Sequence, residues 1–226
     1  MKDQRIFDKN TKLFPCKKPL DEELLKKILF KNWQSIIKEG DELKELKASQ
    51  NITYKSGDYI IRVTFDENGK QLKRIEDEKD FLLYLAKNGL ESSICSPIKP
   101  YLVKDGDLIV MVTRFAKGRA VDYISYEWMR DRKLVGAVGK WLAKLHKLSI
   151  QYTKDHANSY ESFQDWDDLH FNLMKGFPID ERDKKTIGDP IKYGITHSDI
   201  NPSNYFYLEK ENMIDVFDWD QVCFFN

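Results

Sequence analysis

Three polar residues near the C-terminus have the types and the spacing that a site for a hard metal ion requires. Asp199, Asn204 and Asp218 lie in the segment HSDINPSNYFYLEKENMIDVFDWD, which begins at residue 197. Mg²⁺ accepts a few carboxylate and amide oxygens from a protein and completes its shell with waters and substrate phosphates. A nearby carboxylate that does not hold the metal can accept or orient a proton. This set of groups is suited to the transfer of a phosphoryl group.

The elements around these residues are predicted to bring them together. The runs YFYL and MIDVF are rich in aromatic and branched residues and flank the polar sequence EKEN, which is typical of a β-hairpin. A hairpin centred on Glu211 would place Asn204 opposite Asp218 at its open end. The loop that contains Pro202 can curl back and leave Asp199 nearby. Asp and Asn also form turns and cap strands, but the matched spacing favours a binding site over this structural role.

The composition indicates a folded protein without an overall charge bias. The chain has 226 residues, of which 41% are hydrophobic, enough for one large core or two small ones. Lys plus Arg and Asp plus Glu number 37 each, so the net charge offers no field to attract nucleic acid or an anionic membrane. The three cysteines are far apart, and there is no signal peptide or long apolar run. We expect a cytoplasmic protein with neither nucleic-acid nor membrane partners.

The first half of the chain is predicted to contain a sheet and two helices. Residues 19–33 have the apolar spacing of an amphipathic helix with an acidic first turn. Short alternating runs between residues 42 and 65 indicate three antiparallel strands, and residues 107–115 indicate a further buried strand. Residues 76–90 are predicted to form a second helix that ends at an Asn-Gly pair.

The second half is predicted to begin as a helical unit. An apolar stripe runs along residues 133–148, and residues 166–174 favour another helix. The sequence AKGR at residues 116–119 breaks the apolar pattern and marks a boundary. We therefore predict an α+β fold in three parts. These parts are an N-terminal helical extension (1–39), a first lobe (40–116) and a second lobe (117–226).

Together these motifs resemble the aminoglycoside phosphotransferase and choline kinase family, the small-molecule relatives of protein kinases. HSDINPSN and VFDWD are similar to the family's HxDxxxxN and IDxD segments, and EKDFLLYLAKNGL and GKWLAKLHKL are similar to its main N-lobe and C-lobe helices. The resemblance extends from about residue 40 to the end of the chain. It implies a two-lobed protein-kinase-like fold. An antiparallel N-lobe sheet with one main helix would bind the nucleotide, and a mostly helical C-lobe would carry a metal-site β-hairpin.

The resemblance also implies an activity and roles for individual residues. The protein would use ATP and Mg²⁺ to phosphorylate a hydroxyl group of a small molecule such as an aminoglycoside, choline, homoserine or a sugar. Asp199 would be the catalytic base, and Asn204 and Asp218 would bind Mg²⁺. Arg62 would contact the nucleotide phosphates, and Glu78 would hold its guanidinium group. The alternative for this last pair is a weak surface ion pair, a common structural arrangement.

The sequence departs from the family pattern at the nucleotide site. Arg62 stands where the family usually has Lys, and its planar guanidinium group is larger and bidentate. Ser198 replaces a usual Gly after His197, the histidine that we expect to brace the loop. The loop KASQNITYK contains no glycine, so Ser49 and Asn51 would contact the nucleotide phosphates through backbone N–H groups and side chains.

The chain ends eight residues after Asp218, whereas the family continues into further helices. We therefore expect an incomplete, C-terminally truncated second lobe. Val222, Phe224 and Phe225 would then form an exposed apolar face and favour self-association.

Two other functions are consistent with part of the pattern. A catalytically weak nucleotide-binding pseudokinase, or a structural protein of the same fold, would accommodate Arg62 and the shortened second lobe. A protein kinase would share HxDxxxxN, but it would also have a G-x-G-x-x-G loop and D-F-G, where this chain has FDWD. The sequence therefore favours a small-molecule kinase.

Overall fold

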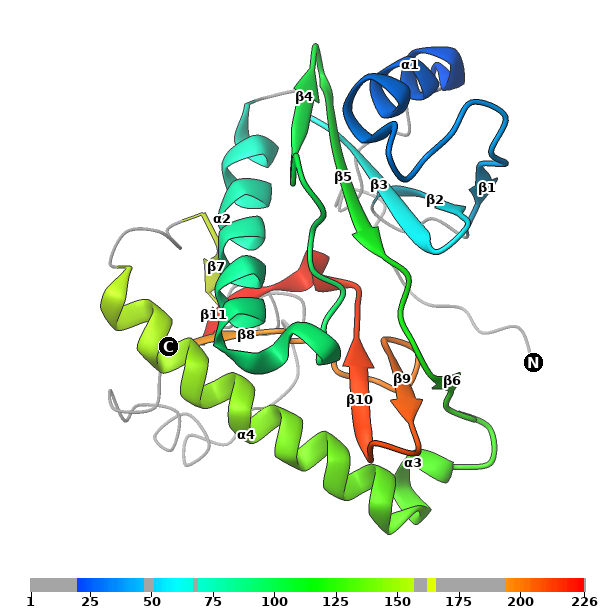
Figure 1. Cartoon of the computed structure of the whole chain (residues 1–226). Helices are drawn as coiled ribbons and strands as arrows, with labels where there is room; N and C mark the ends of the chain where they lie inside the picture. The colour runs from blue at the N-terminus through cyan, green and yellow to red at the C-terminus, as the bar shows by residue number, and fades with distance from the viewer. Residues whose placement is uncertain (1–19, 47–50, 67–68, 157–161, 166–193, 226) are drawn as a thin grey trace, which may run out of the picture.

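The computed structural model describes residues 20–46, 51–66, 69–156, 162–165 and 194–225 (Figure 1). It has a mixed helix and sheet architecture, with an antiparallel five-stranded sheet in the N-terminal half. The described C-terminal half contains a long helix and two three-stranded sheets. Ser49 and the helix predicted over residues 166–174 lie outside the described residues.

The five-stranded sheet has the strand order β1-β2-β3-β5-β4, and all neighbouring strands are antiparallel. Branched residues favour this sheet, because Ile61 and Val63 of β3 and Val110 and Val112 of β5 alternate into one buried cluster. The four strands predicted from alternation are present, and β4 is an additional one. The bounds are β1 (Lys44–Glu45), β2 (Ile52–Ser56), β3 (Tyr59–Phe65), β4 (Val103–Asp105) and β5 (Leu108–Arg114).

Helix α1 (Glu22–Trp33) packs on this sheet. Asp21 begins the helix because its side chain accepts hydrogen bonds from two backbone N–H groups of the first turn. Leu25, Leu29 and Trp33 join the same buried cluster as the sheet residues. The helix and the sheet therefore share one core, and the domain boundaries at residues 39 and 116 remain a prediction.

Helix α2 (Lys70–Leu85) connects two hydrophobic clusters. Ile75 packs with residues of β5, whereas Phe81 and Leu85 belong to the cluster of the C-terminal half. The helix begins at Lys70 rather than at residue 76 as predicted, because Asp66 accepts hydrogen bonds from the N–H groups of its first turn.

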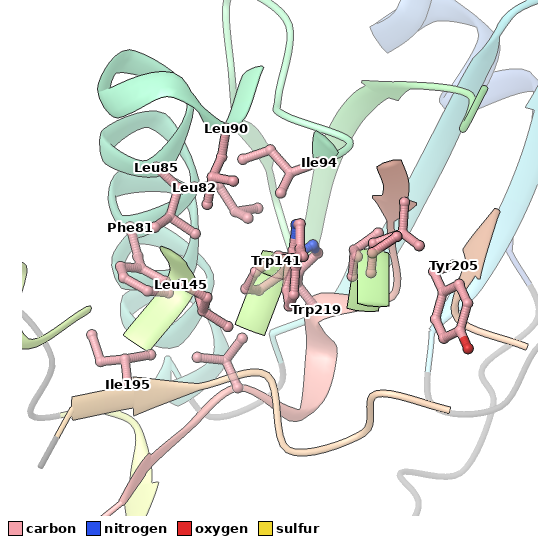
Figure 2. Packing of buried hydrophobic residues seen from close by; sticks show 14 of the residues in the cluster. Phe81, Leu82, Leu85, Leu90, Ile94, Trp141, Leu145, Ile195, Tyr205 and Trp219 are labelled. Carbon is pink, nitrogen blue, oxygen red and sulfur yellow. The ribbon is translucent and has the colours of Figure 1, made fainter. Parts of the chain in front are cut away.

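Helix α4 (Arg132–Asp155) packs against α2 and contributes to the core of the C-terminal half. Its buried stripe includes Leu134, Trp141 and Leu145. Figure 2 shows Trp141 and Leu145 packed near Phe81, which comes from α2. Within the described ranges, no helix combines the length and the apolar character that crossing a membrane requires.

Two small sheets complete the described C-terminal half. One has the order β10-β9-β6 and the other the order β7-β11-β8. The short helix α3 (Glu127–Arg130) precedes α4. The bounds of the strands are β6 (Arg119–Ala120), β7 (Gln164–Asp165), β8 (Gly194–Thr196), β9 (Tyr205–Leu208), β10 (Met213–Val216) and β11 (Cys223–Phe225).

The predicted β-hairpin is present as β9 and β10, but its register differs from the prediction by one residue. Asn204 lies opposite Phe217, whose N–H donates to the carbonyl of Asn204 at 3.0 Å, and not opposite Asp218. The turn between the strands has four residues and ends at Asn212, which has a φ of +51°. This even-numbered turn places the centre of the hairpin between two residues rather than on Glu211.

Val222 is 2% exposed and belongs to the C-terminal hydrophobic cluster. The prediction that Val222 is exposed is therefore wrong. The cause is that the chain turns back after Asp218, so that β11 pairs with both β7 and β8. Self-association through this part of the chain remains a prediction.

Candidate active site

A pocket of about 310 Å³ lies between the five-stranded sheet and the β9–β10 hairpin. One wall comes from β2, β3, β5 and α2, and the other from the loop before β9 and the segment after β10. The lining brings together charged and amide side chains from segments far apart in the sequence. These residues are Asn51, Arg62, Glu78, Arg114, Asn204, Asp218 and Asp220.

Arg62 of β3 and Glu78 of α2 form a buried ion pair in this pocket. Nη2 of Arg62 lies 2.8 Å from Oε2 of Glu78, and the two side chains are 16% and 6% exposed. The pair is therefore buried, unlike the weak surface ion pair that was the alternative interpretation of these two residues. Burial opposes the charge of Arg62, but Glu78, Asp220 and Asp218 outweigh it and raise the pKa of Arg62. Burial raises the pKa of Glu78, and Arg62 counteracts that rise.

Asp199 and Asn204 are in direct contact, as the loop between them was predicted to allow. Nδ2 of Asn204 donates to Oδ2 of Asp199 at 2.9 Å and to the backbone carbonyl of Asp199 at 3.0 Å. Nδ2 of Asn201 donates to Oδ1 of Asp199 at 2.7 Å. Both carboxylate oxygens are thus oriented by amide groups.

Asp218 and Asp220 follow β10, and their side chains contact each other. Burial raises the pKa of Asp218 to about 7; the charge of Asp220 adds to the rise and Arg62 opposes it. Burial also raises the pKa of Asp220, while Arg62 and Arg74 oppose that rise. Two carboxylates buried together repel each other, and a cation beside them would relieve the repulsion.

The chemistry of these side chains fits Mg²⁺. Asp218 offers a carboxylate and Asn204 an amide oxygen, and both are hard ligands. In the described part of the chain, no group of three or more His, Cys, Asp or Glu side chains is placed to hold a metal ion. Mg²⁺ needs only one or two protein carboxylates, because waters and substrate phosphates complete its octahedral shell. Asn204 and Asp218 are the residues that would hold it.

Asn51 lines the pocket but already has partners in the protein. Oγ1 of Thr64 donates to Oδ1 of Asn51 at 2.7 Å, and Nδ2 of Asn51 donates to Oδ2 of Asp220 at 3.4 Å. Its contact with the nucleotide phosphates remains a prediction. Ser49, the other expected phosphate-binding residue, lies outside the described residues.

His197 and Ser198 fix the loop that carries Asp199. His197 is fully buried, and its Nε2 donates to the carbonyl of Phe217 at 2.9 Å, which confirms that this residue braces the loop. Ser198 has a φ of +60°, a conformation that favours glycine, and its Oγ donates to the carbonyl of Gln221 at 2.5 Å. The loop is therefore tied to the segment after β10 on both sides of Asp218.

Sequence reasoning missed Arg74, the basic residue of α2 that contacts the segment after β10. Arg74 donates a hydrogen bond to the backbone carbonyl of Asp220. The available signal was that Arg74 precedes Glu78 by four residues and so shares its helix face. The predicted helix began at residue 76, which excluded Arg74.

The sequence matches no protein-family model and no curated protein sequence. The fold, in contrast, matches solved structures. A spectinomycin phosphotransferase in complex with ADP and spectinomycin has a TM-score of 0.55 and 15% identity, over 92% of this chain and 71% of that chain. The GDP complex of aminoglycoside 2'-phosphotransferase-IIIa has a TM-score of 0.58 and 14% identity, over 91% and 74%. This chain has the protein-kinase-like fold.

A third protein with this kinase-like fold is a choline/ethanolamine kinase family protein from Mesorhizobium loti. It has a TM-score of 0.52 and 14% identity, over 90% of this chain and 66% of that chain. The chain thus spans 66 to 74% of the length of these three structures. At such low identity the likeness establishes the fold, and the activity has to be argued from the site.

Proposed function

We propose that the protein transfers the γ-phosphoryl group of ATP to a hydroxyl group of a small molecule. The observation that carries the proposal is the buried Arg62–Glu78 ion pair in the same pocket as Asn204 and Asp218. In protein kinases a strand lysine pairs with a helix glutamate in this way, and an Asn and an Asp hold Mg²⁺. Asp199, hydrogen-bonded to Asn204, would complete the set as the base.

The pocket offers separate surfaces for the phosphates and for the base of a nucleotide. Arg62, oriented by Glu78, would contact the phosphates. Phe115, Phe206 and Phe217 also line the pocket, in edge-to-face pairs with ring centroids 5.8 and 5.1 Å apart. An aromatic surface suits a planar base. The ADP and GDP complexes among the similar structures support a nucleotide as the phosphate donor.

In the proposed reaction, the acceptor oxygen forms a bond to the γ-phosphorus as the bond to the leaving ADP oxygen breaks. The carboxylate of Asp199 would accept the hydroxyl proton, and Asn201 and Asn204 hold that carboxylate in position. Bound Mg²⁺ supplies neutralisation of the phosphate charge. The guanidinium group of Arg62 would place a positive charge beside the same phosphates, and Glu78 would hold that group in position.

A small-molecule acceptor is supported by the names of proteins with the same fold. One is the spectinomycin phosphotransferase. Another is a microcompartment-associated aminopropanol kinase, with a TM-score of 0.51 and 16% identity, over 89% of this chain and 70% of that chain. We expect the reaction to take place in the cytoplasm, where ATP is supplied.

The proposal is tested by a screen of hydroxyl compounds with Mg²⁺ and ATP, in which ADP release is measured with and without each acceptor. At least one acceptor should stimulate ADP release by the wild-type protein. Asp199→Asn should lower that turnover by about a hundredfold or more, because it removes the proton acceptor, and should leave Mg·ATP affinity unchanged. Loss of ATP binding in Asp199→Asn would contradict the role of Asp199. ATP binding without acceptor-dependent ADP release would favour the pseudokinase alternative.

A further inference from the structure

The turn that follows Asp218 is held by two residues of the N-terminal half. This turn is the 3-10 segment Trp219–Gln221. Arg74 of α2 donates a hydrogen bond to the backbone carbonyl of Asp220. Asn51, directly before β2, donates from Nδ2 to Oδ2 of Asp220 at 3.4 Å. Asp220 is therefore contacted through both its backbone and its side chain.

The contact from Asn51 is itself supported by β3. Thr64 of β3 donates from Oγ1 to Oδ1 of Asn51 at 2.7 Å. Asn51 thus uses its oxygen for Thr64 and its nitrogen for Asp220. The sheet and helix α2 reach the same turn by separate hydrogen bonds.

Arg74 and Glu78 act from the same face of α2. They are four residues apart, about one helical turn, so both side chains project towards the same region. Glu78 holds Arg62 at 2.8 Å, and Arg74 holds the carbonyl of Asp220. One rigid helix therefore sets the spacing between the guanidinium group proposed to bind phosphates and the carboxylates that follow β10.

Arg74 also contributes to the charge balance of this region. The negative charges of Glu78, Asp218 and Asp220 raise the pKa of Arg62. The positive charge of Arg74 opposes the rise in the pKa of Glu78 and of Asp220. Without Arg74, Arg62 alone among these residues would offset the charges of the three carboxylates. Arg74 does not line the pocket, so its influence would reach a bound nucleotide only through these residues.

We infer that Arg74 is a positioning residue for the metal site: by holding the backbone of Asp220, it keeps Asp218 oriented towards the nucleotide phosphates. The inference rests on the proposed function, because it assigns Asp218 to Mg²⁺. It adds a link between α2 and the metal carboxylates that the HxDxxxxN motif and the Arg62–Glu78 pair do not include.

The test is the factor by which Mg²⁺ strengthens ATP binding, measured by calorimetry in excess Mg²⁺ and in EDTA. Arg74→Ala should lower this factor about tenfold, as expected when support for a metal ligand is lost. Arg74→Lys keeps a positive charge and a donor, so it should retain more of the factor than Arg74→Ala. The control Lys70→Ala removes a charge from the exposed start of α2 and should keep the wild-type factor.

Whether the Mg²⁺ factor falls, rises or stays the same in Arg74→Ala separates a positioning role of Arg74 from a purely electrostatic or purely structural role. If Arg74 acted only through its charge, Arg74→Ala would raise the factor, because a more negative site attracts Mg²⁺ more strongly. If Arg74 served only the fold, the thermal midpoint would fall and the factor would not change. Either result overturns the inference. A wild-type protein whose ATP binding ignores Mg²⁺ would overturn the proposed function, and the inference with it.

A second variant keeps the inference testable if Arg74→Ala does not fold. Thr64→Val removes the hydroxyl that supports Asn51, with little change of shape and outside the pocket lining. It should lower the Mg²⁺ factor in the same direction but by less, because the hydrogen bond from Arg74 remains. Thr64→Val tests only the contact from Asn51, so Arg74→Met decides for Arg74 itself: it keeps the length of the side chain and removes its donors. An unchanged factor in Arg74→Met would overturn the inference.

Discussion

The candidate active site is framed by two residues whose backbone conformation favours glycine. Ser198 has a φ of +60° and Asp218 a φ of +63°. Each costs roughly 1 kcal/mol or more relative to an extended backbone, so the surrounding contacts have to maintain it. The contacts are those of His197 with Phe217 and of Ser198 with Gln221. Side chains without proposed roles in catalysis therefore determine how the side chains of Asp199 and Asp218 are oriented.

His197 leads to a prediction about pH. Burial lowers its pKa to about 4, from an ordinary value of 6.5. Between these values the unfolded chain binds a proton that the folded protein does not. The free energy of unfolding should therefore fall as the pH drops from 6.5 towards 4, by at most about 1.4 kcal/mol per pH unit from this residue. Urea unfolding at pH 7 and pH 5 measures the change.

The matched variant is His197→Gln, which retains an N–H donor but does not titrate. It should lose this part of the pH dependence, although its stability at pH 7 is lower. Asp218, whose pKa is raised to about 7, acts in the opposite direction, since it stabilises the fold as the pH falls. Because Asp218 is present in both proteins, its contribution cancels when the free energies of unfolding of wild type and variant are subtracted at each pH. Parallel pH profiles for the two proteins would show that His197 is not buried in its neutral form.

The link between β5 and the C-terminal half depends on the close approach of two backbone segments. Gly118 has a φ of +105°, and a Cβ atom at this position would lie 2.6 Å from the carbonyl oxygen of Tyr207 in β9. Backbone atoms cannot move aside as a flexible side chain can. Gly118→Ala should therefore lower the free energy of unfolding by about 2 kcal/mol or more, measured by urea denaturation.

Gly136 provides the control for this substitution. It lies within α4, and a Cβ atom there would meet nothing within 4 Å. Gly136→Ala should raise the free energy of unfolding by about 0.5 to 1 kcal/mol, because Ala has the higher helix propensity. The same effect in both variants would refute the close approach at Gly118.

The elements of the site were predictable to different degrees, for physical reasons. Alternation and apolar spacing depend on local sequence, so the core strands β3 and β5 and the start of helix α4 were predicted close to their observed bounds. Helix α4 continues to Asp155, past the predicted end at residue 148. The start of α2 depends on Asp66, which lies outside the helix and caps it from the end of β3. The apolar spacing of the helix does not indicate such a cap. The predicted helix therefore lacked the first residues of α2, and Arg74 with them.

The geometry of the site was less predictable than its composition. The sequence placed Asp199, Asn204 and Asp218 in one region, but the hairpin register depends on a turn whose length and left-handed Asn212 are not encoded by the apolar runs. The interaction of Asp220 with Asn51 and Arg74 links segments more than a hundred residues apart. Such contacts arise from packing, and no spacing rule within a single motif predicts them.

In the whole molecule, the pocket lies between the five-stranded sheet, which carries one main hydrophobic cluster, and the C-terminal cluster, which contributes Leu82 and Trp219 to the lining. The chain crosses from one cluster to the other after β5, where Arg114 forms a two-pronged ion pair with Asp215 of β10 at 2.5 and 2.7 Å. Asp215 is fully buried, and it also accepts the N–H of Lys117 at 2.7 Å. This ion pair, together with the hold of α2 on Asp220, fixes the two walls of the pocket relative to each other.

We expect this pocket to bind a nucleotide through a metal ion held by Asp218. The most direct test compares the dissociation constants of ATP with Mg²⁺ and with EDTA, for the wild type and for Asp218→Asn. Mg²⁺ should strengthen ATP binding to the wild type by about tenfold or more, and it should do so far less in Asp218→Asn, because the amide is a weaker ligand than the carboxylate. Affinity for metal-free ATP should not fall in the variant. Equal strengthening by Mg²⁺ in both proteins, or none in the wild type, would show that Asp218 does not hold the metal ion.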